Sequence, residues 1–268
     1  MKNRIETKFL ELKNLNKKFF ACFLTSGDPT NKIFENLLLL LPKLGSNLIE
    51  IGLPFSDPMA DGPTIQRSSQ RAIKSGINIK KTLNTIRKFR EHDSSTPIVL
   101  MGYFNPIYQF GLKDFFYKSN KSGVDGLIIV DLPPEEDSLI KNLSEEYNIH
   151  NIRLIAPTTS KERIKKISKS SRGFLYYVSV MGITGTKKPS INEVKKSVDS
   201  IKKISNLPVL VGFGINSYDQ ITKINKFADG CVVGSAIIKI IEEAIEKKEQ
   251  EKKILEKVAN FLLKLNRG

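Results

Sequence analysis

The segment Leu48-Ile49-Glu50-Ile51-Gly52-Leu53-Pro54-Phe55-Ser56-Asp57-Pro58-Met59-Ala60-Asp61-Gly62-Pro63 places one carboxylate inside an apolar run and a second one beyond it. Its first five residues predict a short buried strand, because β-branched and apolar residues dominate them. Side chains alternate between the faces of a strand, so if Ile49 and Ile51 face a layer of helices, Glu50 faces the other side. The sequence therefore predicts a carboxylate directed into the space that the sheet encloses.

Glu50 is the first candidate catalytic residue. Burying an unpaired carboxylate raises its pKa, and a carboxyl group with a raised pKa can act as a general acid or base at neutral pH. A basic side chain or backbone amides that satisfy Glu50 would make its role structural instead. Asp61, before glycine and proline, also fits ordinary turn chemistry. It becomes a second candidate because it follows the same strand end as Glu50.

Short apolar runs alternate with helix-length segments along the whole chain. This alternation predicts a parallel sheet with right-handed crossovers. For 268 residues we expect an α/β fold, a closed (β/α)8 TIM barrel, as a single domain over residues 1–268. An open doubly wound sheet is the alternative, although no GxGxxG motif follows an early strand. The expected strands are 19–25, 48–52, 98–101, 126–130, 152–156, 174–179, 209–212 and 230–233.

Three departures from a regular barrel are expected. Residues 2–14 predict an additional N-terminal helix that closes the bottom of the barrel. The long interval between the second and third strands has room for an extra helix as well as the standard one. The last helix is expected in two parts, 236–246 and 251–265, joined by a charged hinge.

Composition limits the classes of partner. The formal net charge is +15, yet the lysines are spread over predicted helix faces without interleaved aromatic residues, so we expect no nucleic-acid partner. Cys22 and Cys231 lack CxxC spacing, which argues against a disulfide and a metal site. No apolar run is long enough to cross a membrane and no signal segment precedes the fold, so a cytoplasmic protein is expected.

The last two strands predict a phosphate site. In barrels of this class, the loops after the seventh and eighth strands commonly bind phosphate through backbone amides and a helix N-terminus. Here Gly212-Phe213-Gly214 follows one strand and Gly234-Ser235 follows the other. After the sixth strand, residues 180–188 have the composition of a lid or, equally, of an ordinary loop.

Several motifs together resemble the tryptophan synthase alpha subunit family over essentially the whole chain. The resemblance implies the (β/α)8 fold and a lyase that cleaves indole-3-glycerol phosphate to indole and glyceraldehyde 3-phosphate. The motifs, in order, are Ser26-Gly27-Asp28-Pro29, the segment from Glu50 to Gln66, Asn105-Pro106-Ile107, Asp131-Leu132-Pro133, Tyr177-Val178-Ser179, Gly182-Ile183-Thr184-Gly185 and Gly212-Phe213-Gly214-Ile215.

The resemblance also implies roles for individual residues. Glu50 is the acid/base, Asp61 accepts the indole N–H, Tyr176 supports Glu50, and Thr184 bonds Asp61 when the lid closes. Two further groups are implied: phosphate-binding residues Gly185, Gly214, Gly234 and Ser235, and indole-pocket walls Phe23, Ile65, Leu100, Tyr103 and Leu132.

A partner and a cofactor follow from the same resemblance. The family works with a beta subunit, as an alpha2-beta2 heterotetramer, and the beta subunit carries pyridoxal phosphate; this chain needs no cofactor of its own. The implied partner surface is Pro54, Phe55, Asp57, Pro58, Asn105 and Pro134. An active-site loop packed on its own chain explains the Pro54–Pro58 segment nearly as well.

Two other functions remain open from the residues. One is another phosphate-binding barrel, such as an indole-glycerol-phosphate synthase, which depends on lysines in strands that the strand cores here lack. The other is a binding or scaffolding protein that keeps the fold without turnover; Glu50 and Asp61 argue against it, because a disused barrel gains nothing from a buried carboxylate.

Overall fold

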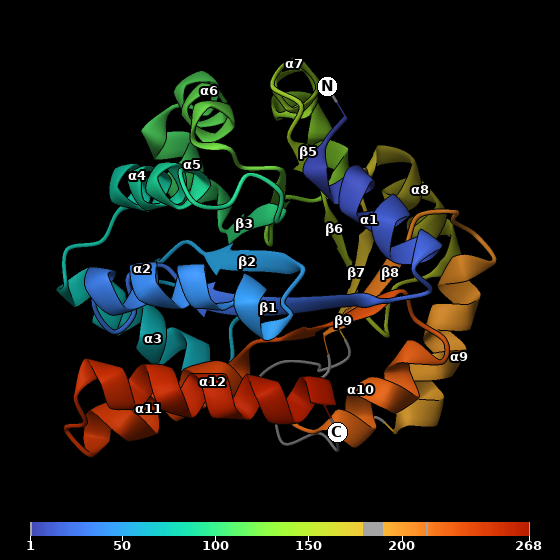
Figure 1. Cartoon of the computed structure of the whole chain (residues 1–268). Helices are drawn as coiled ribbons and strands as arrows, with labels where there is room; N and C mark the ends of the chain where they lie inside the picture. The colour runs from blue at the N-terminus through green and yellow to red at the C-terminus, as the bar shows by residue number, and fades with distance from the viewer. Residues whose placement is uncertain (1, 179–189, 213, 268) are drawn as a thin grey trace.

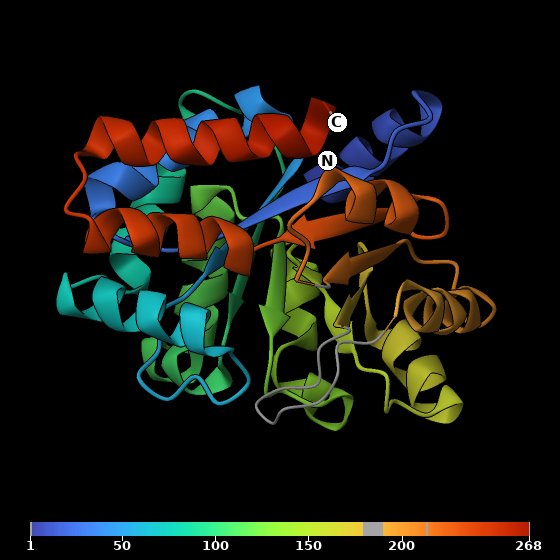
Figure 2. The same ribbon diagram turned by 90° about the horizontal axis from the view of Figure 1, so that it is seen from below.

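Parallel strands form the centre of the molecule, and helices surround them (Figures 1 and 2). The computed structural model describes residues 2–178, 190–212 and 214–267. All its strand pairs are parallel, in the order β5-β4-β3-β2-β1-β9-β8-β7-β6. The strands are β1 Phe19–Thr25, β2 Leu48–Gly52, β3 Ile98–Gly102, β4 Gly126–Ile129, β5 His150–Asn151, β6 Arg153–Ile155, β7 Leu175–Val178, β8 Val209–Gly212 and β9 Gly230–Val233.

One chain segment joins the two ends of this order. β5 pairs with β4, β6 pairs with β7, and only Ile152 separates β5 from β6. The single strand predicted at 152–156 is therefore wrong in detail, because the segment changes its pairing partner at Ile152. The predicted barrel is confirmed, with its fifth strand in two pieces.

The expected additional helices are present. An N-terminal helix precedes β1, two helices lie between β2 and β3, and the last helix is split; a pair of helices after β3 was not predicted. The helices α11 and α12 lie side by side (Figures 1 and 2). The helices are α1 Arg4–Asn14, α2 Asn31–Leu40, α3 Pro63–Lys74, α4 Ile79–Arg90, α5 Phe104–Phe110, α6 Leu112–Ser122, α7 Lys141–Glu146, α8 Lys161–Ser170, α9 Ile191–Lys202, α10 Tyr218–Asn225, α11 Ser235–Glu246 and α12 Glu251–Arg267, with 3-10 turns η1 Pro42–Leu44 and η2 Pro134–Leu139.

The strand register fixes which side chains face the interior of the barrel. Glu50 on β2 is aligned with Phe23 on β1 and with Val99 on β3. Its neighbours Ile49 and Ile51 are fully buried on the opposite face, toward the helices. The predicted inward orientation of Glu50 is confirmed by this alternation.

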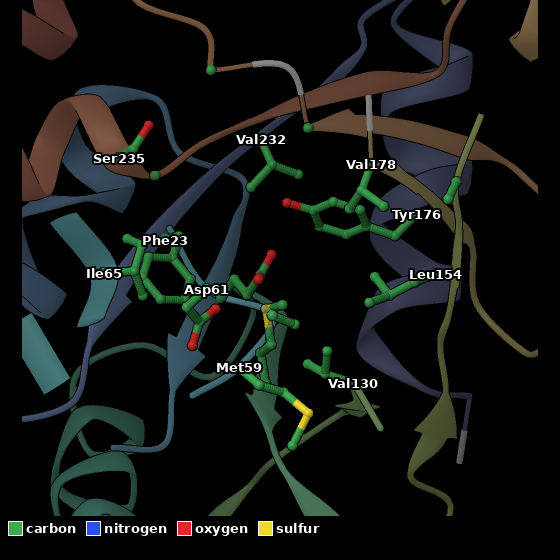
Figure 3. Close-up of a pocket in the computed structure, with 17 residues that line it drawn as sticks. Phe23, Met59, Asp61, Ile65, Val130, Leu154, Tyr176, Val178, Val232 and Ser235 are labelled. Carbon is green, nitrogen blue, oxygen red and sulfur yellow. The ribbon is translucent and has the colours of Figure 1, made fainter. Parts of the chain in front are cut away.

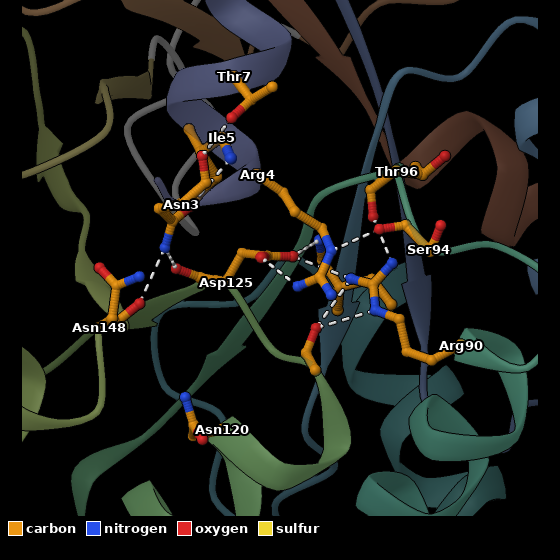
Figure 4. A network of polar contacts seen from close by, with 12 residues as sticks. Asn3, Arg4, Ile5, Thr7, Arg90, Ser94, Thr96, Asn120, Asp125 and Asn148 are labelled. Atoms are coloured by element: carbon orange, nitrogen blue, oxygen red, sulfur yellow. Dashed lines mark hydrogen bonds and ion pairs between the residues drawn. The ribbon is translucent and has the colours of Figure 1, made fainter. Parts of the chain in front are cut away.

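The helix α1 closes the end of the barrel where the strands begin. Its Ile5 is buried and lies beside Gly126 and Gly173, at the starts of β4 and β7. Asn3 caps the helix by accepting from the Ile5 N–H, and its side-chain amide donates to the carbonyl of Asp125 at 2.8 Å. The predicted bottom helix is therefore confirmed and is held by a polar network (Figure 4).

The Asp125 carboxylate is the centre of that network. Its Oδ1 lies 2.9 Å from Arg4 Nη1, and its Oδ2 lies 2.9 Å from Arg90 Nη2. The Ile98 backbone N–H also donates to Oδ2, at 2.8 Å.

Within the described ranges, no helix is long and apolar enough to cross a membrane.

Candidate active site

A cavity of about 590 Å³ opens at the end of the barrel where the strands finish. Figure 3 shows Ser235 on one side of it, at the start of a helix, and Val130 and Leu154 on the other side. The lining residues are Phe23, Glu50, Met59, Ala60, Asp61, Ile65, Met101, Val130, Leu154, Ala156, Tyr176, Val178, Gly212, Gly214, Val232, Gly234 and Ser235. The lining thus combines apolar side chains with two carboxyl groups and a glycine-rich end.

Glu50 is a buried carboxyl group, and no cation among the described residues compensates its charge. The residue is 1% exposed, and its Oε1 has no hydrogen-bond partner in the described part of the chain. Burial, and secondarily the nearby Asp61 charge, raise the pKa of Glu50 to about 8. At neutral pH this group therefore holds a proton that it can deliver into the cavity.

Asp61 lies on the loop between β2 and α3. The Tyr103 hydroxyl donates to Asp61 Oδ2 at 3.2 Å, and the Gln66 side-chain amide donates to the Asp61 carbonyl at 2.9 Å. Burial raises the pKa of Asp61 to about 6, and the hydrogen bond from Tyr103 opposes this rise. Asp61 is consequently mostly ionised at pH 7, when Glu50 is mostly protonated.

Tyr176 on β7 extends its hydroxyl into the cavity (Figure 3). Burial, and secondarily Glu50, raise the pKa of Tyr176 well above its usual value, so its hydroxyl keeps its proton. A methyl group at Gly212 would come within 2.7 Å of the Tyr176 ring, so glycine is needed there for the ring to occupy this place. Glu50 and Tyr176, predicted to act together, lie in the same cavity lining.

The predicted phosphate residues lie together at the glycine-rich end. Gly214, Gly234 and Ser235 all line the cavity, and Ser235 begins α11. Among the described residues, no side chain caps this helix, and its first turn contains no acidic residue, so no described carboxylate offsets the positive end of the helix dipole. Among the described lining residues none is basic. Thr184 and Gly185, also predicted for the site, lie outside the described residues.

The apolar wall differs in part from the prediction. Phe23 and Ile65 line the cavity, but Leu100, Tyr103 and Leu132 do not. Leu100 is aligned with Ile51, which places it on the helix-facing side of the barrel. The alternation assigns its neighbour Met101 to the interior instead.

Sequence reasoning did not single out nine of the seventeen described lining residues. Met101, Leu154 and Val232 are assigned to the interior by the strand register, which relates them to Glu50 across the sheet and which the sequence does not provide. The residues not singled out from the sequence as site residues are Met59, Ala60, Met101, Val130, Leu154, Ala156, Val178, Gly212 and Val232.

The predicted partner surface lies on loops at the same end of the barrel. Asp57 and Asn105 are exposed, and Pro134 is half-buried at the start of η2. Phe55 is half-buried, with its ring centroid 5.3 Å from that of Tyr103. Pro58 is buried within the chain, so it supports its loop and presents no surface of its own.

The described part of the chain contains no site suited to metal binding or thiol chemistry. No group of three or more His, Cys, Asp or Glu residues is placed there to hold a metal ion. Cys22 and Cys231 are free and buried, and burial raises the pKa of each thiol to about 12. Both thiols therefore remain protonated and unreactive at neutral pH.

The arrangement suits proton transfer to an apolar group that also carries an anion. A protonated carboxyl group and an ionised carboxylate share an apolar cavity, and a helix N-terminus lies at one end of it. Such a site can protonate a carbon, stabilise a developing cation and bind an anion through backbone dipoles.

Comparisons with known proteins agree with this geometry. The family model described as "Tryptophan synthase alpha chain" matches residues 9–265. The tryptophan synthase alpha chain of Caulobacter vibrioides (strain NA1000 / CB15N) is 46% identical over 248 residues, which are 92% of this chain and 90% of that relative.

Two solved structures extend the likeness to the fold. The crystal structure of tryptophan synthase subunit alpha from Legionella pneumophila strain Paris has a TM-score of 0.92 and 38% identity, and the match covers 100% of this chain and 98% of that one. A structure of tryptophan synthase from M. tuberculosis in an open form has a TM-score of 0.85 and 28% identity, and the match covers 99% of each chain.

Proposed function

The chain belongs to the tryptophan synthase alpha chain family, and on that premise we propose how its cavity carries out the alpha reaction. The enzyme subunit cleaves indole-3-glycerol phosphate to indole and glyceraldehyde 3-phosphate, a step of aromatic amino-acid biosynthesis. As a cleavage without hydrolysis or oxidation, this reaction is of the lyase class. The observation that carries the proposal is the buried Glu50, whose Oε1 has no partner among the described residues, beside Asp61 in one apolar cavity.

Glu50 moves the protons. In its protonated form it delivers a proton to the indole carbon that bears the side chain, which puts positive charge on the ring nitrogen. The resulting carboxylate then takes the proton of the side-chain hydroxyl, and the carbon–carbon bond to the indole ring breaks. The electron pair of that bond returns to the ring and restores its aromaticity. Because the pKa of Glu50 is raised to about 8, both forms are accessible near neutral pH.

Asp61 stabilises the intermediate charge. Its carboxylate accepts the indole N–H, and its negative charge opposes the cation that develops on the ring. Tyr176 lies in the same lining as Glu50 and supports it, while Phe23 and Ile65 pack against the ring. Gly214, Gly234 and Ser235 bind the phosphate through backbone N–H groups and the start of α11.

A beta subunit is the partner that the family implies. We propose an alpha2-beta2 heterotetramer in the cytoplasm, in which the beta subunit binds pyridoxal phosphate and joins the released indole to serine. The loops that carry Phe55, Asp57, Asn105 and Pro134 are at the mouth of the cavity and form the docking surface. The alpha chain needs no cofactor, because Glu50 supplies the proton transfers and Asp61 stabilises the developing charge.

The alternatives are weaker for specific reasons. A synthase of the indole-glycerol-phosphate type needs lysines in its site, and no described lining residue is basic. A scaffold without turnover leaves the cost of burying Glu50 unexplained.

Indole release from indole-3-glycerol phosphate tests the proposal directly. The purified chain should release indole slowly, and adding a beta subunit should increase the rate. The absence of release both with and without the beta subunit would refute the proposed reaction.

A further inference from the structure

Tyr103 does not line the cavity, but its hydroxyl makes two hydrogen bonds to the loop that carries Asp61. It donates to Asp61 Oδ2 at 3.2 Å, and it accepts the Ala60 backbone N–H at 3.0 Å. Tyr103 directly follows β3 and is 3% exposed, so its ring is anchored at the end of a barrel strand and not on the loop. One buried atom thus connects the strand end to both the backbone and the side chain of the segment that carries Asp61.

The rest of this loop is anchored differently. The Gln66 side chain in the first turns of α3 donates to the backbone carbonyls of Asp61 and Pro58. Among the described residues, the Tyr103 hydroxyl is the hydrogen-bond partner of the Asp61 carboxylate. The direction of that carboxylate therefore depends on Tyr103 more than on Gln66.

The ring of Tyr103 contacts the loop at a second point. Its centroid lies 5.3 Å from that of Phe55, with 35° between the ring planes. Phe55 is half-buried, and the adjacent Ser56 and Asp57 are exposed. A displacement of the exposed part of the loop would therefore reach Tyr103 through the Phe55 ring.

We propose that Tyr103 is a positioning residue that holds the Asp61 carboxylate toward the substrate, and that the Phe55 ring couples this position to the Pro54–Pro58 loop. The inference rests on the proposed function, because it assigns Asp61 its role in the reaction. It adds a connection from the loop that faces the partner to a group that touches the substrate.

The electrostatics agree with this geometry. The hydrogen bond from Tyr103 lowers the pKa of Asp61 against the larger effect of burial. Replacing Tyr103 by phenylalanine removes that bond, so Asp61 should hold its proton to a higher pH. Because Asp61 must be ionised to act, the acidic limb of the rate profile should move to higher pH as well.

Tyr103→Phe is the first variant, and Tyr218→Phe on exposed α10 is its matched control. The Asp61 carboxyl titration is followed by 13C NMR in the free protein, and kcat and KM for indole release are measured against pH. We expect Tyr103→Phe to raise the midpoint of the Asp61 titration by about one unit. We expect it to lower kcat about tenfold with KM within about twofold of wild type, and the control to change neither.

The titration separates this inference from the proposed function. If the wild type releases no indole, the reaction assignment fails, while the Asp61 titration still decides whether Tyr103 acts on Asp61. An unchanged titration in folded Tyr103→Phe, as judged by its thermal unfolding, would overturn the inference even if the wild type is active.

Phe55→Leu tests the second half of the linkage. It keeps an apolar side chain but removes the ring contact, so the Asp61 titration should shift in the same direction by a smaller amount. In the Tyr103→Phe background, Phe55→Leu should add no further shift, because both act through one hydroxyl. Shifts that simply add would show that Phe55 acts independently of Tyr103 and would overturn the coupling.

Discussion

At the end of the barrel where the strands begin, the Asp125 carboxylate is bonded to Arg4, Arg90 and the Ile98 N–H. Glu50, on the side of the cavity, has one oxygen without a hydrogen-bond partner among the residues that the structure describes. The two residues are almost equally buried, 2% and 1% exposed. Burial raises the pKa of both, but cations and an N–H oppose the rise at Asp125, and only a second negative charge adds to it at Glu50. Equal burial therefore gives opposite roles: Asp125 fixes the structure, and Glu50 is kept ready to exchange a proton.

The proton-exchanging role of Glu50 is tested by Glu50→Gln, which keeps the shape of the side chain but cannot exchange a proton. We expect kcat for indole release to fall about 10³-fold, with KM close to that of the wild type. Glu91→Gln, at an exposed site after α4, is the control. Retention of a third or more of the wild-type kcat would contradict the assignment of Glu50.

Removal of the structural carboxylate should have the converse effect. Asp125→Ala removes the carboxylate that bonds both Arg4 and the partly buried Arg90, so it should lower the free energy of unfolding in urea by about 3 kcal/mol. The kcat of the molecules that remain folded should stay within about twofold of wild type. Asp219→Ala, at an exposed ion pair on α10, is expected to cost less than about 0.5 kcal/mol. A similar small cost for Asp125→Ala would mean that the network in Figure 4 does not hold the barrel end.

Asp61→Asn separates the role of Asp61 from that of Glu50 within the cavity. The amide lacks the negative charge that opposes the developing cation, so kcat should fall about 10²-fold. Wild-type activity should rise as pH increases through about 6, where Asp61 ionises, and fall above about 8, where Glu50 loses its proton. The variant should lose the acidic limb and keep the basic limb; an unchanged acidic limb would assign that limb to another group.

The smallest effect concerns stability. The pKa of Glu50 is about 8 in the folded protein and 4.5 for the free group, so the folded state retains a proton that the unfolded state releases between these values. The contribution of Glu50 to the free energy of unfolding of the wild type is therefore fully present below about pH 4.5 and is lost as pH rises through 8. We compare the free energies of unfolding in urea of Glu50→Gln and wild type at pH 5 and pH 8.5. The difference, variant minus wild type, should be about 1–3 kcal/mol more favourable to the variant at pH 8.5 than at pH 5. No difference between the two pH values would show that Glu50 is already ionised at neutral pH.

Much of the barrel was predictable because each strand is a short apolar run bounded by turn residues. The segment that closes the barrel was not, since Ile152 changes its pairing partner within a continuous run and nothing in the sequence marks that point. The pair α5 and α6 was missed because Gly111 separates two short helices that read as one segment.

Site prediction succeeded where a residue type breaks the local pattern. A glutamate in an apolar strand marks its own face, so Glu50 was assigned correctly to the interior. Leu100 was not, because β3 is apolar at every position before Gly102 and the sequence alone does not say which parity faces inward. Tyr103 was expected in the pocket wall, and only the distances to Asp61 and Ala60 show that its hydroxyl bonds the catalytic loop.

The cavity holds no basic side chain in its described lining, although the whole chain carries a net charge of +15. We therefore expect attraction from a distance and retention at close range to come from different parts of the molecule. The surface lysines should attract a phosphate dianion through a field that salt screens over about 8–10 Å, whereas fixed backbone dipoles should hold it in the cavity. Added salt should accordingly slow capture of the substrate and leave its dwell time nearly unchanged, and the phosphorylated product can leave without breaking an ion pair.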